Sequence, residues 1–529
     1  MELVYFIMIG VYGVFILFIF LYSLMQANLV FNYWRSKKEE RLEVKGQSEK
    51  LQEESEENES FNFQLSTFNY PQVTIQLPIF NERYVVERLI DCIMEFDYPK
   101  DKLEIQVLDD STDDTAEIIA NKVAEVKVKG FDIVHITRTN RQGYKAGALA
   151  EATPIAKGEF IAIFDADFLP KRDFLKQTIP HFQNKKVGVV QTKWEHLNTG
   201  YSMLTSLQAF GLDAHFTVEQ RGRNSANHFI NFNGTAGVWR KTCIADAGGW
   251  ESDTLTEDLD LSYRAQLKGW KFKYLENVES PAELPATMNA LKTQQFRWTK
   301  GAAECTRKNL VRVLQSSGVK TSTKLHAIFH LMNSFLFVCI LCLSVLSVPM
   351  LVAKNNLPNH QYLFEFGSLF LVSLLILSLF YWVSYNTKFK NKLISLLFFA
   401  IKFPLFLAVS MGLSLHNSIA VMEGYMGKKS PFVRTPKFNI TANDDKWRGN
   451  KYITNAINPL TMVEGGLILY FLYGIFLSFR YGDYGLMPFY VMLTLGYSIV
   501  FYYSIYHSLN MLRNRKKVNS TQQLITYNT

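Results

Sequence analysis

Five apolar runs, each long enough to cross a bilayer, constrain the fold of this 529-residue chain more than any other feature. A membrane-spanning helix needs about 20 predominantly apolar residues. Runs of that kind lie at 3–25, 326–353, 361–385, 461–479 and 486–511. The first run lacks the basic start and the small-residue cleavage site of a removable signal peptide, so we expect it to be an anchor. The sequence therefore predicts a globular domain inserted between transmembrane helices.

Basic residues predict how these helices are oriented. The formal net charge is +8, and its cationic side chains cluster after the first, third and last apolar runs. Lysine and arginine beside a membrane span mark its cytoplasmic side. We therefore expect the amino terminus outside, the globular domain and the carboxyl tail inside, and no nucleic-acid partner. The clusters are Arg35, Lys37 and Lys38; Lys388, Lys390 and Lys392; and Arg513, Arg515, Lys516 and Lys517.

A further apolar segment, residues 391–423, complicates the count of crossings. Lys402, Pro404 and His416 interrupt it, and a basic stretch follows it at 428–437. A crossing there would place that basic stretch outside, against the positive-inside rule. We therefore expect a re-entrant or interfacial segment and five crossings.

The chain divides into seven expected segments. The linker among them is too rich in charge to pack, so we expect a solvated tether. The segments are a first transmembrane helix (1–34), a charged linker (35–66), an α/β domain (67–285), interfacial helices (286–325), transmembrane helices with the re-entrant or interfacial segment (326–423), a cytoplasmic loop (424–457), and transmembrane helices with a basic tail (458–529).

Short apolar runs alternate with amphipathic stretches in the globular part. Such alternation indicates a mostly parallel, doubly wound sheet whose ligand lies at the carboxyl ends of the strands. The expected strands are 73–79, 103–109, 131–137, 160–167 and 187–194, and the expected helices are 85–96, 115–126 and 146–156.

Acidic residues fall at the ends of two expected strands. Asp109 and Asp110 end one strand, and Asp165 and Asp167 end another. Two carboxylates one residue apart can share a hard divalent cation such as Mg²⁺ or Mn²⁺, which prefers oxygen ligands. No Walker-type glycine loop accompanies them, which disfavours a P-loop enzyme.

Two later stretches each allow a structural and a functional interpretation. In the stretch DTLTEDLDL, Thr254 and Glu257 match a helix capping box, whereas Asp258 at the helix start is a candidate general base. In QQFRW, the tryptophan matches an interfacial membrane anchor or the floor of an active site. These residues alone do not decide between the alternatives.

The motifs LDD, DAD, TED and QQFRW occur in the order and approximate spacing of the signature of processive family 2 glycosyltransferases. The chain resembles that family, which includes cellulose, chitin and hyaluronan synthases, and is most similar to the cellulose-synthase-like mannan and glucan synthases. The resemblance covers about residues 70–310 and the general membrane layout. Further shared stretches are QLPIFNE (76–82), NRQGYKAGAL (140–149), DAHFTVEQ (213–220) and FNGTAGVWR (232–240).

The resemblance implies a cytoplasmic α/β domain of the GT-A, Rossmann-like kind and a role for each matching residue. Glu82, Asp109 and Asp110 would hold the base and ribose of the nucleotide, and Lys145 would reach the diphosphate. Asp165 and Asp167 would bind the sugar nucleotide and Mg²⁺ or Mn²⁺. Asp258 would be the catalytic base, and Asn233 and Gly234 would lie near the terminal sugar of the acceptor. Gln294, Arg297 and Trp298 would line the acceptor end, with Arg297 stabilising the leaving diphosphate and Trp298 packing on a sugar ring.

The resemblance also implies a gating loop with the pattern F-x-V-T-x-K. The stretch 432–437 matches its Phe432, Thr435 and Lys437, but it has Arg434 where valine is usual. A basic cytoplasmic loop that only follows the positive-inside rule is the alternative.

We therefore expect an inverting β-glycosyltransferase that uses a UDP- or GDP-sugar, of the glucose or mannose type, to elongate and export a β-linked polysaccharide. The alternatives are transfer of one sugar to a membrane lipid, and a transporter or scaffold whose domain only binds nucleotides. Expected partners are the nucleotide-sugar, a glycan or lipid acceptor and membrane lipids, with a homo-oligomer or accessory export proteins left open. The expected location is a bacterial inner membrane or, in a eukaryote, the Golgi or plasma membrane.

Overall fold

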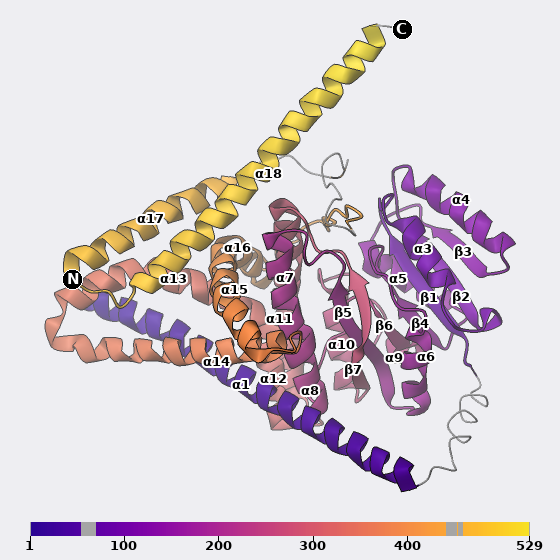
Figure 1. Cartoon of the computed structure of the whole chain (residues 1–529), viewed down its shortest axis with the longest axis horizontal. Coiled ribbons are helices and arrows are strands. Elements are labelled where there is room, and N and C mark those ends of the chain that lie inside the picture. Colours follow the sequence, from indigo (N-terminus) through magenta and orange to yellow (C-terminus); the bar gives the residue numbers. More distant parts are fainter. Residues whose placement is uncertain (1, 54–69, 441–451, 453–458, 528–529) are drawn as a thin grey trace.

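The computed structural model describes residues 2–53, 70–440, 452 and 459–527, and it places an α/β domain beside a bundle of long helices (Figure 1). The domain is built on a seven-stranded sheet with the order β3-β2-β1-β4-β6-β5-β7. The strands are β1 Val73–Ile79, β2 Leu103–Asp109, β3 Asp132–Thr137, β4 Phe160–Ile163, β5 Val187–His196, β6 Gly237–Arg240 and β7 Lys271–Ala282.

Most pairs in this sheet are parallel, as predicted. The strand β6 alone among them runs antiparallel, to both β4 and β5. The sequence patterns did not predict β6 or β7. The strand β4 is also shorter than predicted, because it ends at Ile163 and leaves Asp165 and Asp167 in the turn that follows.

Helices cover both faces of the sheet. One face packs on α3 Val86–Met94, α4 Thr115–Val128 and α6 Phe174–Thr178. The other packs on α5 Tyr144–Ile155, α9 Lys241–Asp246 and α10 Glu257–Leu267. Because both faces are covered, every residue of β2 is buried. This includes the polar Glu104 and Gln106, which accept hydrogen bonds from Thr74 and Gln76 of β1. The predicted α/β fold class is confirmed.

Three further helices connect this domain to the bundle. They are α7 Met203–Ala214, α8 Gln220–Ser225 and α11 Met288–Gln315, and a π-helical turn, η3 His215–Glu219, joins the first two. The helix α11 lies between the sheet and the bundle (Figure 1). It carries the whole QQFRW motif, which the sequence placed among interfacial helices. The shorter α12 Thr321–Leu331 follows it.

Six helices among the described residues are long and apolar enough to cross a membrane. They leave many large apolar side chains exposed, as a lipid-facing surface requires. These observations support a multi-pass membrane protein. The helices are α1 Glu2–Glu53, α13 Phe335–Asn356 (continuous with α12), α14 Ser368–Asn386, α15 Lys392–Gly412, α17 Pro459–Tyr481 and α18 Met487–Tyr527.

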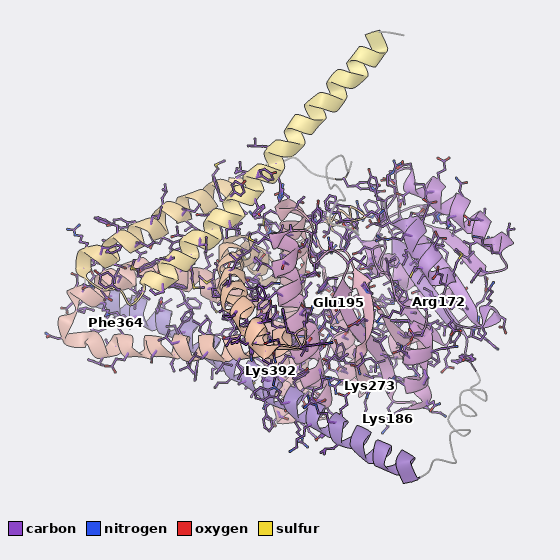
Figure 2. The ribbon with its side chains drawn as sticks, in the orientation of Figure 1. Arg172, Lys186, Glu195, Lys273, Phe364 and Lys392 are labelled. Atoms are coloured by element: carbon purple, nitrogen blue, oxygen red, sulfur yellow. The ribbon has the colours of Figure 1, made fainter. Side chains whose placement is uncertain are left out.

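Contacts at the two ends of the bundle show at which end each connection between helices lies, and in this respect α15 differs from the other five helices. At the end far from the domain, Asn356 bonds Tyr5 and Lys354 pairs with Asp483. Figure 2 shows Phe364, which joins α13 to α14, at that far end, and Lys392, which starts α15, near the domain.

The segment that contains α15 and α16 Ser414–Tyr425 begins and ends beside the domain. Before it, Lys388 lies 2.6 Å from Asp213 on α7. Near its end, Glu423 lies 3.1 Å from Lys300 on α11. A segment that returns to its starting side makes no net crossing, so this geometry favours the five-crossing topology, which stays a prediction.

The first helix differs from the sequence prediction. It continues past residue 34 to Glu53, through much of the predicted solvated linker. Arg221 pairs with Glu40 at 2.9 Å, and Lys37 pairs with Glu276 at 3.1 Å. These ion pairs dock the polar part of α1 on the domain. The prediction of a solvated tether, which rested on the high charge of this segment, is therefore wrong for this part of α1. Residues 54–66 of that linker lie outside the described residues.

Candidate active site

A cavity of about 180 Å³ opens where β1, β2 and β4 end, at the edge of the sheet that faces α11. Every site residue predicted from the sequence lines it, apart from Asp109. Those lining residues are Glu82, Asp110, Lys145, Asp165, Asp167, Asn233, Gly234, Asp258, Gln294, Arg297 and Trp298. Segments separated by more than 200 residues in the sequence therefore meet at one site.

The two aspartates at the end of β2 differ in their surroundings. Asp110 faces the cavity and accepts a hydrogen bond of 2.8 Å from Nε of Arg138. Asp109 is buried behind it, 2.9 Å from Nε2 of His135. Burial raises the pKa of Asp109, but hydrogen bonds from His135 and Ser111 outweigh it and leave that pKa lowered. Asp109 is thus a buried support for the strand end that carries Asp110.

Asp165 lies beside a cation at the centre of the cavity. The Nζ atom of Lys145 lies 2.5 Å from Asp165 and 2.8 Å from the carbonyl oxygen of Gly234. Burial lowers the pKa of Lys145, but the charges of Asp165, Glu257 and Asp258 outweigh it and leave that pKa raised. Lys145 therefore stays protonated, as binding of a diphosphate would require.

Asp167 lies deeper and contacts the 432–437 stretch. Its Oδ2 atom lies 2.7 Å from Nζ of Lys437 and accepts a hydrogen bond from the backbone N–H of Glu283. Glu283 in turn accepts hydrogen bonds from the backbone N–H groups of Phe438 and Asn439, each at 2.8 Å. Burial raises the pKa of Glu283 to about 7. These contacts fasten the loop directly over the two aspartates.

The donor set of Asp165 and Asp167 fits a hard divalent cation. Both carboxylates line the same cavity, one residue apart on a tight turn, and carboxylate oxygen is the preferred ligand of Mg²⁺ and Mn²⁺. In this arrangement Lys145 and Lys437 neutralise the two carboxylates.

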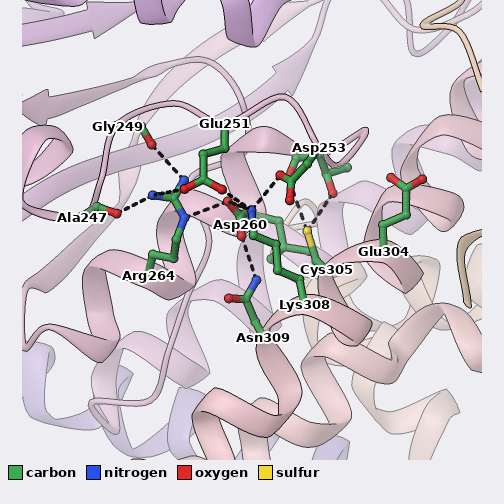
Figure 3. Close-up of polar contacts among 12 residues, drawn as sticks. Ala247, Gly249, Glu251, Asp253, Asp260, Arg264, Glu304, Cys305, Lys308 and Asn309 are labelled. Atoms are coloured by element: carbon green, nitrogen blue, oxygen red, sulfur yellow. Dashed lines mark hydrogen bonds and ion pairs between the residues drawn. The ribbon is translucent and has the colours of Figure 1, made fainter. Parts of the chain in front are cut away.

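A second acidic cluster, formed by Glu251, Asp253 and Asp260, fits a metal less well. Its oxygen atoms lie within 4.8 Å of one another, but Nζ of Lys308 lies among them at 2.6, 2.7 and 3.0 Å (Figure 3). Asp260 is also bonded by Arg264 at 2.8 Å. The lysine therefore supplies the positive charge that a metal would bring, and the cluster fastens α10 to α11.

Asp258 stands at the start of α10 and faces the cavity. Burial, together with the neighbouring negative charge of Glu257, raises the pKa of Asp258 to about 7. The backbone N–H of Leu259 donates to its Oδ1 atom at 2.8 Å. A pKa near the working pH is the property of an effective general base.

Tight packing around Asp258 depends on two glycines. A Cβ on Gly234, which has φ +78°, would lie 3.1 Å from Oδ2 of Asp258. A Cβ on Gly301 of α11 would lie 2.5 Å from the side chain of Thr256. The alternative that Thr254 caps this helix is wrong, because α10 begins at Glu257 and its N-cap position is Thr256.

One face of α11 presents the QQFRW motif to the cavity. Arg297 lies against the ring of Phe432, 4.5 Å from its centroid. Trp298 lies 6.5 Å from Trp194 of β5, ring centre to ring centre. Gln294 is buried one turn earlier. This placement favours the active-site interpretation of the motif over a membrane anchor, because its residues face the same cavity as the aspartates.

The 432–437 stretch lines the cavity with Phe432, Arg434, Thr435 and Lys437. Phe432 stacks on Tyr144 with ring centres 5.6 Å apart. Arg434, at the position where the family pattern has valine, lies 2.5 Å from Oε2 of Glu82. Burial raises the pKa of Glu82 to about 7, although Arg434 opposes that shift. The loop thus contacts both the predicted nucleotide end and, through Lys437, the predicted metal end.

A second cavity, of about 330 Å³, adjoins the first and extends toward the membrane helices. The two share Asp258, Trp298, Asn233 and Trp194. The motifs did not identify Trp194, Glu283 or the residues that line this second cavity from α1 and α13. The shared stretch DAHFTVEQ contains His215 and Phe216, which line it from η3, but no role was predicted for them.

Comparisons with known proteins identify relatives of this chain. A family model described as "Glycosyltransferase like family 2" matches residues 71–301. Glucomannan 4-beta-mannosyltransferase 1 of Oryza sativa subsp. japonica is 41% identical over 300 residues, which cover 54% of this chain and 58% of that relative. Glucomannan 4-beta-mannosyltransferase 2 of Arabidopsis thaliana is 37% identical over 391 residues, which cover 71% of this chain and 69% of that relative.

The match to the rice protein spans less than two thirds of that relative's length. Among solved structures, a mannosyltransferase from Pyrobaculum calidifontis in complex with GDP-Man and Mn²⁺ aligns over 79% of this chain and 100% of its own, with 18% identity and a TM-score of 0.48. That likeness is too distant to carry an argument about substrate. The sequence matches and the α/β domain between apolar helices lead to one conclusion: the chain belongs to glycosyltransferase family 2, among the cellulose-synthase-like proteins.

Proposed function

We propose that the protein is a membrane-embedded, inverting hexosyltransferase that elongates a β-linked glycan from a UDP- or GDP-sugar. One observation carries the proposal: a candidate base, two candidate metal ligands, two cations and an indole ring meet in a single cavity. The names of the relatives, glucomannan 4-beta-mannosyltransferases, support mannose as the transferred sugar and a glycan as the acceptor.

The donor lies, in this proposal, across the carboxyl ends of β1, β2 and β4. Glu82 and Asp110 bind the nucleoside end, with Asp109 holding the strand end behind them. Lys145, protonated and buried, binds the diphosphate. Ligands of open α/β sheets bind at this edge, so the position of the cavity supports the assignment.

Asp165 and Asp167 would hold Mg²⁺ or Mn²⁺ at the diphosphate. A bound divalent cation there neutralises charge on the leaving group. For the cation and donor to bind, Lys437 must move away from Asp167, and the loop that carries Lys437 is the candidate gate.

The chemical step is a single displacement at the anomeric carbon of the donor. Asp258 takes the proton of an acceptor hydroxyl, and that oxygen forms the new bond to the anomeric carbon. The bond to the diphosphate breaks, and its electron pair leaves with the diphosphate. Lys145 and Arg297 place positive charge beside that leaving group. Attack from the opposite face converts an α-linked donor into a β-linked product.

The acceptor end is formed by α11 in this proposal. Trp298 offers its indole face to a sugar ring, with Gln294 beside it, and Asn233 and Gly234 lie next to the base. The second cavity leads from this point toward the membrane helices, which supports export of the growing chain through the bundle. The basic residues that flank the spans support a cytoplasmic position for the catalytic domain.

A panel of labelled sugar nucleotides tests the function directly. Purified full-length protein is incubated with UDP- and GDP-sugars, Mg²⁺ or Mn²⁺ and a membrane extract, and the products are sized before and after β-mannanase or β-glucanase digestion. We expect a polymer from GDP-mannose that β-mannanase degrades. A lipid that carries one sugar would instead establish the non-processive alternative.

The matched variants are Asp167→Asn and Asp173→Asn. The first removes a candidate metal ligand and should abolish transfer at any metal concentration. The second removes the charge of an aspartate on the same domain that does not line the cavity, and it should leave transfer unchanged. Full transfer by Asp167→Asn would refute the metal assignment.

A further inference from the structure

A histidine on the π-helical turn η3, His215, lines the second cavity, and a glutamate of the same turn, Glu219, lies behind it. The Nδ1 atom of His215 lies 2.7 Å from Oε2 of Glu219, and its Nε2 atom lies 3.3 Å from Oδ1 of Asn233. His215 and Asn233 both line the cavity that contains Asp258 and Trp298. Single π-helical turns inside α-helical stretches occur often at functional sites.

The hydrogen-bond pattern defines the charge on His215. Its Nδ1 atom faces a carboxylate oxygen and its Nε2 atom faces an amide oxygen, so both ring nitrogens must donate. Asn231 donates to the same Oδ1 atom of Asn233 at 2.7 Å, which identifies that atom as the oxygen. The ring therefore satisfies both partners only as an imidazolium.

Glu219 is held ionised to balance that charge. Burial raises the pKa of Glu219, but the charges of Arg223 and His215 outweigh it and leave that pKa lowered. Arg223 lies 2.5 Å from its Oε1 atom. The turn thus holds a fixed carboxylate behind the imidazolium, and both side chains are mostly removed from solvent.

This arrangement determines the direction of the Asn233 amide. Two donors occupy its oxygen, so the amide cannot rotate by 180° without placing its NH₂ group against donors. Its Nδ2 atom is buried and has no hydrogen-bond partner within the described part of the chain. Nε1 of Trp194, which also lines both cavities, is likewise buried without a partner among the described residues.

We propose that His215, charged and held by Glu219, is a positioning residue that fixes Asn233 so that its NH₂ group donates a hydrogen bond to an oxygen atom of the acceptor's terminal sugar. That bond would orient the acceptor hydroxyl toward Asp258, whose Oδ2 atom lies close to the neighbouring residue Gly234. The inference rests on the proposed function and assigns the part of that site that recognises the acceptor.

A double-mutant cycle tests this inference. His215→Ala, Asn233→Ala and the double variant are purified as full-length protein, and the KM and kcat are measured with a soluble β-1,4-manno-oligosaccharide as acceptor and GDP-mannose as donor. We expect each single variant to lower kcat/KM for the acceptor about tenfold, the size of one lost hydrogen bond to a charged or fixed partner. The double variant should be no worse than Asn233→Ala, because both act through one amide. The KM for the donor should not change.

Two further variants separate positioning from folding. Glu219→Gln keeps the shape of the side chain and should also weaken acceptor use, because it removes the charge that holds His215. His181→Ala, on the 3-10 helix Ile179–Gln183, lines neither cavity and should have no effect. Additive losses in the double variant, or equal losses for donor and acceptor, would overturn the inference.

Binding of the oligosaccharide, measured by calorimetry with GDP and Mn²⁺ present, gives a readout that does not need turnover. A wild type that transfers no sugar would refute the proposed function, whereas weaker oligosaccharide binding by His215→Ala would still support the positioning role. Unchanged binding by both His215→Ala and Glu219→Gln would refute that role alone.

Discussion

The pH dependence of turnover should report the ionisation of Asp258. Burial and the charge of Glu257 raise the pKa of Asp258 to about 7, and a base works only in its ionised form. With that pKa, ~9% of the carboxyl groups are ionised at pH 6 and ~91% at pH 8, so kcat should rise about tenfold across this interval. An aspartate with an ordinary pKa of about 4 would give a flat profile there.

Changing Glu257 to glutamine should move this profile in a defined direction. Glu257 is the second largest cause of the raised pKa of Asp258 and acts through its negative charge. Its removal makes ionisation of Asp258 easier, so the midpoint should move to lower pH and the ratio of kcat at pH 6 to kcat at pH 8 should increase. Because the two carboxyl groups titrate together, the measured midpoints belong to the pair.

The assay is initial-rate sugar transfer at saturating donor and acceptor between pH 5.5 and 8.5. Saturation matters because Glu82 and Glu283 also have a pKa raised to about 7, and their ionisation would act mainly through donor binding. Glu117→Gln removes a charge from the exposed side of α4 and serves as the control. A flat wild-type profile, or a midpoint for Glu257→Gln that is unchanged or higher, would refute the assignment of Asp258 as a buried base.

Three further predictions concern Trp298 as an acceptor platform, the membrane topology, and the ion pairs of Lys308 that fasten α10 to α11. Trp298→Ala should abolish elongation while leaving GDP binding intact, and Trp298→Phe should retain part of the elongation activity. A wild-type polymer yield from Trp298→Ala would contradict the role of Trp298 as an acceptor platform. Single cysteines at the exposed positions Lys390 and Met426, which flank the segment with α15 and α16, should label from the same side of the membrane in a background without the five native cysteines. Labelling from opposite sides would mean that α15 crosses. Lys308→Met should destabilise the protein by about 1–3 kcal/mol, because the buried Asp260 loses a charged partner, and the thermal midpoint in detergent measures this loss. As a control, Lys268→Met removes an exposed ion pair with Asp246 and should change the thermal midpoint little. Equal thermal midpoints for the two variants would contradict a stabilising role of the Lys308 ion pairs.

The sequence alone determined the architecture and the composition of the site. The leucine, isoleucine and valine residues of 103–109 identified a strand, and the bounds of β2 at Leu103 and Asp109 agree with the prediction. Apolar periodicity is a local property, so it can be recognised without a structure. Ordered motifs likewise identified the residues that line the cavity, from Glu82 to Trp298. The same reasoning missed β6, because a strand as short as Gly237–Arg240 has too few residues to show a period. It also missed β7, whose apolar residues are interrupted by Glu276, Asn277 and Glu279.

Only the tertiary structure decided which of these residues act on one another. No local pattern indicates that Arg434 pairs with Glu82, which lies more than 350 residues earlier, or that Lys437 lies against Asp167. The docking of α1 on Arg221 was missed for the same reason, since a charged segment looks solvated until its partners are known. The imidazolium of His215 is the clearest case. Its charge follows from two acceptors, Glu219 and Asn233, that the π-helical turn and the fold bring to opposite sides of one ring. A residue type specifies which chemistry is available, whereas distance, burial and hydrogen-bond partners determine which of it is used.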